Sequence, residues 1–183
     1  MAETTQQSEA IPASYPTAPS GLSTAAAALD ASMVWQRIES YVAHRWTARA
    51  VIWIVEGAGD WCAPLTPATV SATETWQNYA WATATLNPTA YGGYVLPGDG
   101  PYRFTASVGS GTPPDAVLNA YRRLAEYMAE DTGTFSGATS ESSDIGPVTL
   151  SVTRNQAWMA RALQNSGAAD LLRPYRRASN VAV

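Results

Sequence analysis

The sequence of 183 residues contains no lysine, one cysteine, one histidine and two phenylalanines. The single cysteine, Cys62, excludes an internal disulfide and any metal site built from several thiolates. The single histidine, His44, would need a nucleophile or carboxylate brought beside it by the fold, and no catalytic or metal motif surrounds it. We therefore interpret both residues as structural and expect no enzyme activity, catalytic residue, metal or cofactor.

Long hydrophobic runs are also missing, because no stretch of about 18 or more apolar residues occurs that would predict a membrane span. The N-terminus has neither the basic start nor the apolar segment of a secretory signal. The formal net charge is -4, with every basic residue an arginine. An acidic chain lacks the broad basic face that wraps nucleic acid. Together with the missing signal segment, membrane span and disulfide, this leads us to expect a soluble protein of a reducing cytoplasm.

The first part of the chain predicts an arm followed by a helix. Residues 1–21 are rich in Thr, Gln, Ser, Pro and Ala and predict a flexible arm. Ser23 or Asp30 is a suitable N-cap for a helix that runs to about His44. Its apolar stripe consists of Leu29, Met33, Val34, Ile38, Tyr41 and Val42.

After this helix, apolar residues recur at every second position, as in β-strands. The segments AVIWIVEG, ATVSATETW, YAWATATL, YGGYVLPG and PYRFTASVG are β-branched and aromatic, and turn residues separate them. In the last segment Tyr102, Phe104, Ala106 and Val108 alternate with polar residues, which indicates one buried and one solvated face. Residues 48–108 are thus predicted to form four or five antiparallel strands.

A second helix is predicted over about 113–130, with Thr112 as N-cap, Pro113 at its first position and Asp115 in its first turn. A polar loop over 131–147 and a short strand, VTLSVT, follow. The last helix is expected from Asn155 to about 172, with a break near Ser166–Gly167.

The predicted fold class is therefore α+β. It is a small helical bundle of two long helices and a C-terminal helix, with the antiparallel β-rich insertion between the first and second helices and extended terminal arms. The predicted organisation is an N-terminal arm (1–21), a body (22–172) and a C-terminal arm (173–183).

The aromatic residues of the β region allow an alternative function. They could form a platform for sugars, as in carbohydrate-binding modules, although aromatics on half-buried strands are more often core or interface anchors. The residues concerned are Trp53, Trp61, Trp76, Trp81, Tyr91, Tyr94 and Tyr102.

The chain ends on a basic tail, since three arginines and no acid lie among its last eleven residues. Pro174 interrupts the preceding helix. A tail that cannot bury itself can become ordered in a partner's groove, where arginines pair bidentately and tyrosine adds rigid apolar area.

The order of these segments resembles that of the head–tail connector (adaptor) proteins of long-tailed bacteriophages and gene transfer agents. The matching segments are ESYVAHRWTAR (39–49), RAVIWIVEG, GGYVLPGDGPYRFTASVG (92–109), PPDAVLNAYRRLAEYMAE and NSGAADLLRPYRR (165–177). They cover about residues 25–177, and the leading segment 1–21 departs from the family pattern.

This resemblance implies a structural virion protein that is assembled in the host bacterial cytoplasm and located in the neck of the particle. Such proteins form a ring, usually of twelve subunits, that joins the portal protein to a tail-side stopper or tail terminator and helps close the DNA-filled head. The genome passes through the ring without sequence-specific binding, and no membrane is involved. A stopper or tail-terminator ring protein is the first alternative, and the carbohydrate-binding β module is the second.

The resemblance further implies that the C-terminal tail reaches into the portal. The implied portal-binding residues are Leu171, Leu172, Arg173, Pro174, Tyr175, Arg176 and Arg177.

Overall fold

The computed structural model describes residues 1–130, 140–145, 148–153 and 159–176. The chain divides into two compact units, which we describe separately. The β unit comprises Met1–Pro16, Ala43–Thr112 and Tyr175–Val183, and the helical unit comprises Thr17–Val42 and Pro113–Pro174. Each unit is therefore assembled from segments that are distant in the sequence.

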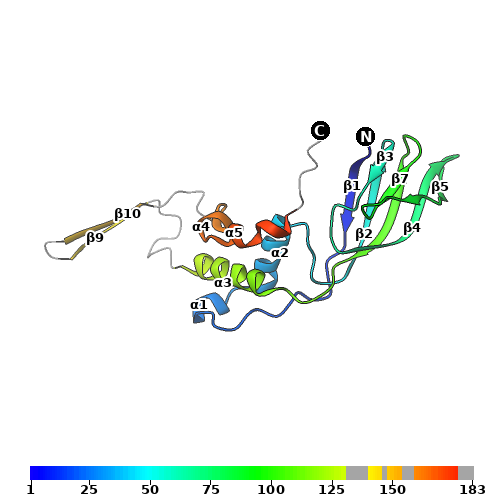
Figure 1. The fold of residues 1–183 in the computed structure, drawn as a ribbon. Helices are drawn as coiled ribbons and strands as arrows, with labels where there is room; N and C mark the ends of the chain where they lie inside the picture. The colour runs from blue at the N-terminus through cyan, green and yellow to red at the C-terminus, as the bar shows by residue number, and fades with distance from the viewer. Residues whose placement is uncertain (131–139, 146–147, 154–158, 177–183) are drawn as a thin grey trace. The chain divides into compact units, whose positions relative to one another are not determined.

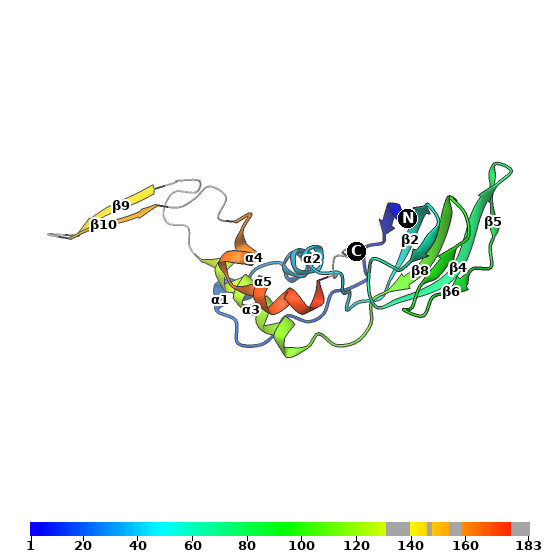
Figure 2. The ribbon, with the colours of Figure 1, turned by 45° about the horizontal axis from the view of Figure 1, so that its top comes forward.

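The β unit contains a five-stranded antiparallel sheet in the order β1-β2-β8-β4-β5 (Figures 1 and 2). A three-stranded antiparallel sheet in the order β3-β7-β6 completes it. The strands of the larger sheet are β1 (Glu3–Glu9), β2 (Arg49–Glu56), β4 (Ala68–Gln77), β5 (Ala80–Thr83) and β8 (Tyr102–Val108). Those of the smaller sheet are β3 (Gly59–Trp61), β6 (Asn87–Pro88) and β7 (Tyr94–Leu96).

Strand alternation builds the core of the β unit. The predicted inward residues of β8 are all buried, and Val51, Trp53 and Val55 of β2 alternate with more exposed neighbours in the same way. Trp61 of β3 stacks on Phe104 with ring centroids 4.1 Å apart, which brings the two sheets together across the core. The full cluster is Val51, Trp53, Val55, Trp61, Leu65, Leu96, Tyr102, Phe104, Ala106 and Val108.

The prediction of a flexible arm over residues 1–21 is wrong for its first part, because Glu3–Glu9 form β1 at the edge of the larger sheet. β1 pairs antiparallel with β2 from Glu3 opposite Glu56 to Glu9 opposite Val51. Its residues are polar because both its outer edge and most of its side chains face solvent, so the apolar alternation that marks the other strands is absent.

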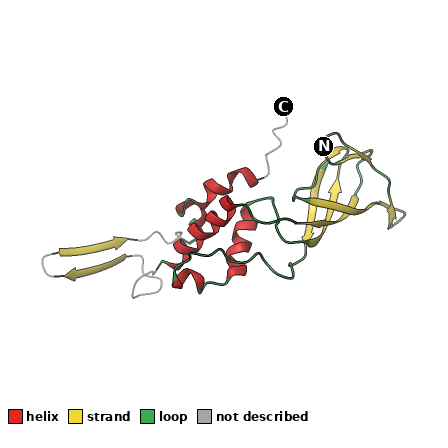
Figure 3. Ribbon diagram, turned by 60° about the horizontal axis from the view of Figure 1, so that its bottom comes forward, coloured by secondary structure: helices red, strands yellow, loops and turns green. Residues whose placement is uncertain are grey.

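The helical unit packs several short helices around α3 (Asp115–Ala129) (Figure 3). Trp35 and Tyr121 lie at its centre with ring centroids 5.1 Å apart. The remaining helices are α1 (Thr24–Ala27), α2 (Ala31–Tyr41), α4 (Ala162–Asn165) and α5 (Ala168–Leu172). The 3₁₀ helix η1 (Arg173–Tyr175) follows α5, and its last residue already belongs to the β unit. The buried apolar residues are Ala26, Val34, Trp35, Ile38, Val117, Ala120, Tyr121, Leu124, Ala125, Ala162, Leu163, Ala168 and Leu172.

The first predicted helix is divided in two because both candidate caps are used. The Ser23 hydroxyl accepts a hydrogen bond from the Ala26 N–H and starts α1, and the Asp30 carboxylate accepts one from the Ser32 N–H and starts α2. Hydrogen bonds from the Ser32 hydroxyl and N–H lower the pKa of Asp30. α2 ends at Tyr41, since Val42 is extended.

The predicted fold class is wrong. The protein is β-rich, with two antiparallel sheets in the β unit and short helices, of which the longest, α3, has 15 residues and α2 has 11. There is no bundle of two long helices among the described residues (Figure 3). The sequence pattern overestimated the helices because a continuous apolar stripe does not reveal the interruption at Asp30.

Residues 131–147 were predicted to be a loop, but Ser140–Ile145 form β9, which pairs antiparallel with β10 (Val148–Thr153). The strand predicted for VTLSVT is confirmed as β10. The expected cap Asn155 lies outside the described residues. The break predicted near Ser166–Gly167 within the last helix is confirmed, since Gly167 has a φ of 71° and separates α4 from α5. No helix of the described residues has the length and apolar character needed to span a bilayer.

Candidate interaction surfaces

The C-terminal residues implied in portal binding do not share one environment. Leu172 is the last residue of α5 and is fully buried in the helical unit, and Leu171 is half-buried. Arg173 and Pro174, which begin η1, are exposed. Leu172 therefore fixes the body of the helical unit, whereas its two successors face solvent.

Tyr175 and the residues after it belong to the β unit. The Tyr175 carbonyl accepts a hydrogen bond from the Ala43 N–H at 3.1 Å. Its ring contacts those of His44 and Trp46, with centroids 6.2 Å and 6.0 Å away. Arg176 is exposed, and Arg177 lies outside the described residues. Tyr175 thus attaches the tail to the β unit immediately before the basic residues.

His44 is part of this attachment. It forms a β-bridge with Thr66, and its ring lies 4.9 Å from that of Trp46. Burial, and then the nearby positive charge of Arg45, lower the pKa of His44 below its usual value. The imidazole is therefore predominantly neutral at pH 7. Its contacts are aromatic and backbone groups, in agreement with the structural interpretation.

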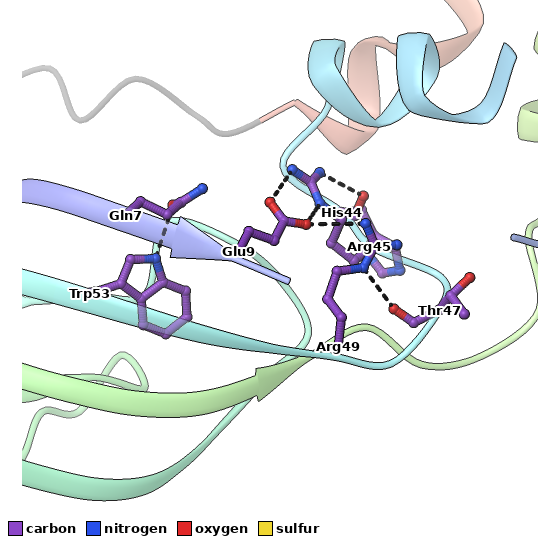
Figure 4. Close-up of polar contacts among 7 residues, drawn as sticks. All are labelled: Gln7, Glu9, His44, Arg45, Thr47, Arg49 and Trp53. Carbon is purple, nitrogen blue, oxygen red and sulfur yellow. Dashed lines mark hydrogen bonds and ion pairs between the residues drawn. The ribbon is translucent and has the colours of Figure 1, made fainter. Parts of the chain in front are cut away.

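A charged cluster joins the end of β1 to the segment that leads into β2 (Figure 4). The Glu9 carboxylate accepts hydrogen bonds from Arg45 Nε at 2.7 Å and Arg49 Nη1 at 3.1 Å. The arginine side chains are 9% and 4% exposed, and that of Glu9 is 20% exposed. Arg49 also donates to the Thr47 carbonyl and lies over the ring of Tyr15. The Glu9 carboxylate thus bridges two nearly buried guanidinium groups.

Two indole groups fix the register of β1. Trp53 Nε1 donates to the Gln7 side-chain oxygen at 2.9 Å (Figure 4), and Trp61 Nε1 donates to the Thr4 hydroxyl at 2.9 Å. Gly57 has a φ of 95°, and a Cβ at this position would lie 2.3 Å from the Met1 carbonyl oxygen. Side chains and a close backbone approach thus fix the N-terminal strand in place.

Sequence reasoning missed these residues. The strand ETTQQSE offers no apolar alternation, and Glu9 is separated from Arg45 by 36 positions. The available signal was that arginines beside a strongly apolar strand require a carboxylate from elsewhere, since buried charges are paired. Nothing in the sequence identifies which acidic residue supplies it.

The β4–β5 turn carries a second group, which we call the aromatic hairpin (Trp76–Trp81). Trp76 and Trp81 face each other across the two strands with ring centroids 5.2 Å apart. The connecting turn is Asn78–Tyr79, with φ values of 49° and 63°. Tyr79 is 94% exposed and Trp76 is 42% exposed. The hairpin therefore presents aromatic surface at its tip.

A cation supports this hairpin from β8. The Arg103 guanidinium lies 4.7 Å from the centroid of the Trp81 ring and donates to both carboxylate oxygens of Glu74, at 2.6 Å and 2.7 Å. The hydrogen bond from Arg103 lowers the pKa of Glu74, and the same bond raises the pKa of Arg103. Both groups thus stay charged over a wide pH range.

An apolar pocket of about 300 Å³ lies near the other end of β4. Gly93 in its wall is closely packed, because a Cβ there would lie 2.2 Å from the Trp61 carbonyl oxygen. A further hollow of about 240 Å³ shares Val70 and Tyr94 with it. The pocket is lined by Trp61, Ala63, Ala68, Val70, Pro88, Gly92, Gly93 and Tyr94.

The seven aromatics considered for sugar binding do not form one platform. Trp53, Trp61 and Tyr102 are in the core of the β unit. Trp76 and Trp81 belong to the aromatic hairpin, whereas Tyr94 lines the apolar pocket and Tyr91 is 89% exposed. The pattern predicted aromatic strands, but it did not separate core residues from surface residues.

The other sequence candidates are accounted for structurally. Cys62 is a free, half-buried thiol. The Glu126 carboxylate accepts hydrogen bonds from the Ser23 N–H and hydroxyl, both at 2.7 Å, which lowers the pKa of Glu126 and links α1 to α3. Arg122 Nε donates to the Ser20 carbonyl. Within the part of the chain that the structure describes, no group of three or more His, Cys, Asp or Glu residues is placed to hold a metal ion.

Comparison with known proteins adds little to this geometry. No protein-family model matches the sequence, and no curated protein matches it. The structure is similar to a chain of the solved "Virion of native gene transfer agent (GTA) particle", with 16% sequence identity and a TM-score of 0.48. This similarity covers 83% of the present chain and 77% of the other chain. At that identity and score it determines neither the fold nor the function.

Proposed function

We propose that this protein is a structural component of a phage-like particle, a head–tail connector that joins the portal to the neck proteins. The observation that carries the proposal is the arrangement of the C-terminal segment. Leu172 is buried, and the next two residues, Arg173 and Pro174, are exposed. The chain is thus fixed at Leu172 and presents the Arg173 guanidinium to solvent directly after it.

This arrangement suits docking to an acidic partner. Arginine forms planar, bidentate hydrogen bonds to carboxylates, and Pro174 limits the conformations that the segment loses on binding. The burial of Leu172 in the helical unit fixes the point from which Arg173 and Pro174 extend. In a ring, which we propose to have twelve subunits, several weak contacts of this kind would act together.

In this proposal the partners are the portal protein above, neighbouring copies at the sides, and a stopper or tail terminator below. The location is the neck of the virion, and the genome passes through without sequence-specific contacts. The protein acts by binding and not by catalysis. Of the portal-binding residues that the resemblance implied, we retain the exposed Arg173, Pro174 and Arg176. Residues 177–183 form the remainder of the arm in this proposal.

The test compares charge reversals in the helical unit. Arg173→Glu is expected to weaken co-sedimentation with portal rings of the same particle about tenfold or more, since it places a carboxylate where a cation is needed. Arg123→Glu, an equal charge change at another exposed residue of this unit, serves as the control and should bind normally. Equal binding by both variants and the unmodified protein would contradict the proposal.

Truncation must spare Tyr175. A chain that ends after Leu172 would lose the contacts of Tyr175 with Ala43, His44 and Trp46, so a binding defect would be ambiguous. A chain that ends after Arg176 retains them. It should bind the portal more weakly than the full chain, and equal binding would exclude residues 177–183 from the arm.

A stopper or tail-terminator ring is the second candidate. Such proteins are usually dominated by β-sheet, so the two sheets and the short helices of this chain favour it. Electron microscopy of particles that contain the labelled protein would distinguish the two. A ring in direct contact with the portal supports the connector, and a ring that contacts only tail proteins supports the alternative.

A further inference from the structure

Tyr79 occupies a backbone position that disfavours it. Its φ of 63° lies in the left-handed region, where a residue other than glycine costs about 1–2 kcal/mol. Two-residue hairpin turns with this geometry favour Asn-Gly, and the chain has Asn78-Tyr79. The side chain is 94% exposed, so it contributes nothing to the core in return. Strained residues cluster at binding and switch sites, so the tip of the aromatic hairpin is a candidate contact site.

The β unit also contains a pocket that could receive such a residue. The apolar pocket near Ala68 and Val70 has a volume of about 300 Å³, which exceeds the cavity of about 150 Å³ that accepts benzene. A phenol ring therefore fits it. Aromatic and small residues line the pocket, and none of the lining residues carries a charge. The hairpin turn, Gln77–Ala80, is also uncharged, so contact between the two does not add to the repulsion between chains of net charge -4.

The turn and the pocket lie toward opposite ends of one strand. β4 runs from Ala68 to Gln77, and seven to nine residue steps of about 3.3 Å separate the pocket residues from the turn by roughly 23–30 Å. A subunit therefore cannot insert Tyr79 into its own pocket without dismantling β4. A second copy can accept it, because each copy offers the projection at one end and the recess at the other.

We propose that Tyr79 of one copy inserts into the apolar pocket of the next, so that copies of this chain associate head to tail. The contact joins two different surfaces of the same unit, and such heterologous contacts form closed rings when the rotation between copies permits. Trp76 and Trp81 border the inserted ring and extend the apolar area. The contact supplies the lateral association of the proposed ring, and in that respect it rests on the proposed function.

The first experiment replaces Tyr79 by glycine, which suits the left-handed backbone at this position, so that the variant is expected to fold. Tyr79→Gly relieves the left-handed conformation, so the full chain should remain at least as stable to urea while its self-association, measured by sedimentation equilibrium, weakens at least tenfold. Asn78→Gly is the matched control, since it relieves the neighbouring residue and leaves the ring in place. It should associate as the unmodified protein does.

The second experiment identifies the receiving site. A photoreactive phenylalanine analogue at position 79 should cross-link between copies to residues that line the pocket, such as Ala63 or Pro88. Val70→Phe fills the pocket from its wall and should reduce both the cross-linking and the association.

Several outcomes would overturn the inference. They are a protein that stays monomeric and yields no intermolecular cross-link at any concentration, association unaffected by Tyr79→Gly, or cross-links confined to other surfaces. Binding of oligosaccharides by the hairpin, without self-association, would also overturn it. Arg173→Glu should leave self-association intact, so loss of portal binding and loss of the Tyr79 contact are separable. Failure of portal binding with an intact Tyr79 contact contradicts only the proposed function.

Discussion

Leu172 and Arg173 are sequence neighbours with opposite environments. Leu172 is fully buried among the helices, whereas Arg173 is exposed. We expect Leu172→Ala to lower the free energy of unfolding by about 2–5 kcal/mol through lost burial and the cavity left behind. Arg173→Ala should change it by about 0.5 kcal/mol or less. Urea titration followed by circular dichroism measures both, and equal effects would contradict the assignment of Leu172 to the core.

His44 predicts a pH dependence at the attachment of the tail. Its folded-state pKa lies below the unfolded value of about 6.5, so the unfolded chain binds the proton more readily. The contribution of His44 to stability is therefore complete above about pH 6.5 and declines as the pH falls toward the folded-state pKa. NMR titration of the His44 ring protons should show this lowered pKa, and His44→Gln should flatten the stability profile in this window. An unshifted or raised pKa would refute the prediction.

At single positions the sequence was informative only where one local interaction decides the conformation. Asp30 and Ser23 are caps in the structure because their side chains reach a backbone N–H two or three residues ahead. Thr112 is not the cap of α3, since the helix begins later and its N-cap is Pro114. Tyr79 was assigned to a strand because an aromatic residue in a two-residue turn gives no turn signal.

Among the elements, β1 is linked to the segment before β2 by the Glu9 carboxylate. Glu9→Gln would remove the charge that two nearly buried guanidinium groups share, so the free energy of unfolding should fall by about 2–4 kcal/mol. Glu3→Gln is the control, because it makes the same charge change in the same strand at an exposed residue. Chemical denaturation of both variants measures the difference. Similar stabilities would show that the pairing with β2 alone holds β1.

Elements were predictable where burial imposes a period. β8 was recognised because Tyr102, Phe104, Ala106 and Val108 all face the core, which forces strict alternation. β1 was not, because an edge strand with a solvated face can consist of Thr, Gln and Ser. The prediction of one long first helix was wrong because the apolar spacing continues across Leu29–Asp30, whereas the backbone ends α1 and starts α2 there.

At the scale of the whole molecule, each unit has its own core, so the two should respond separately to core variants. In a chain whose helical-unit tryptophans, Trp35 and Trp158, are replaced by phenylalanine, tryptophan fluorescence reports on the β unit, and the helix signal at 222 nm reports mainly on the helical unit. Glu9→Gln should shift the fluorescence transition to lower denaturant and leave the helix signal nearly unchanged, and Leu172→Ala should do the reverse. A common shift of both signals in both variants would contradict independent units.

The division into units could not be predicted from the sequence. The predicted boundaries followed composition, which placed the limits of the arms near residues 21 and 173. The β unit instead takes in segments from both ends of the chain, through contacts such as Glu9 with Arg45 and Tyr175 with Trp46. Such pairings depend on long-range geometry, and no local pattern encodes which distant partner a residue meets.

The composition of the β unit has a consequence for how the protein is made. Strands β1, β2, β4 and β8 can pair once residue 108 has left the ribosome, whereas Tyr175 emerges only after the segments of the helical unit have been made. The attachment beside His44 and Trp46 therefore stays open until that point in synthesis. A chain that stops before Tyr175 would contain a paired sheet without these aromatic contacts.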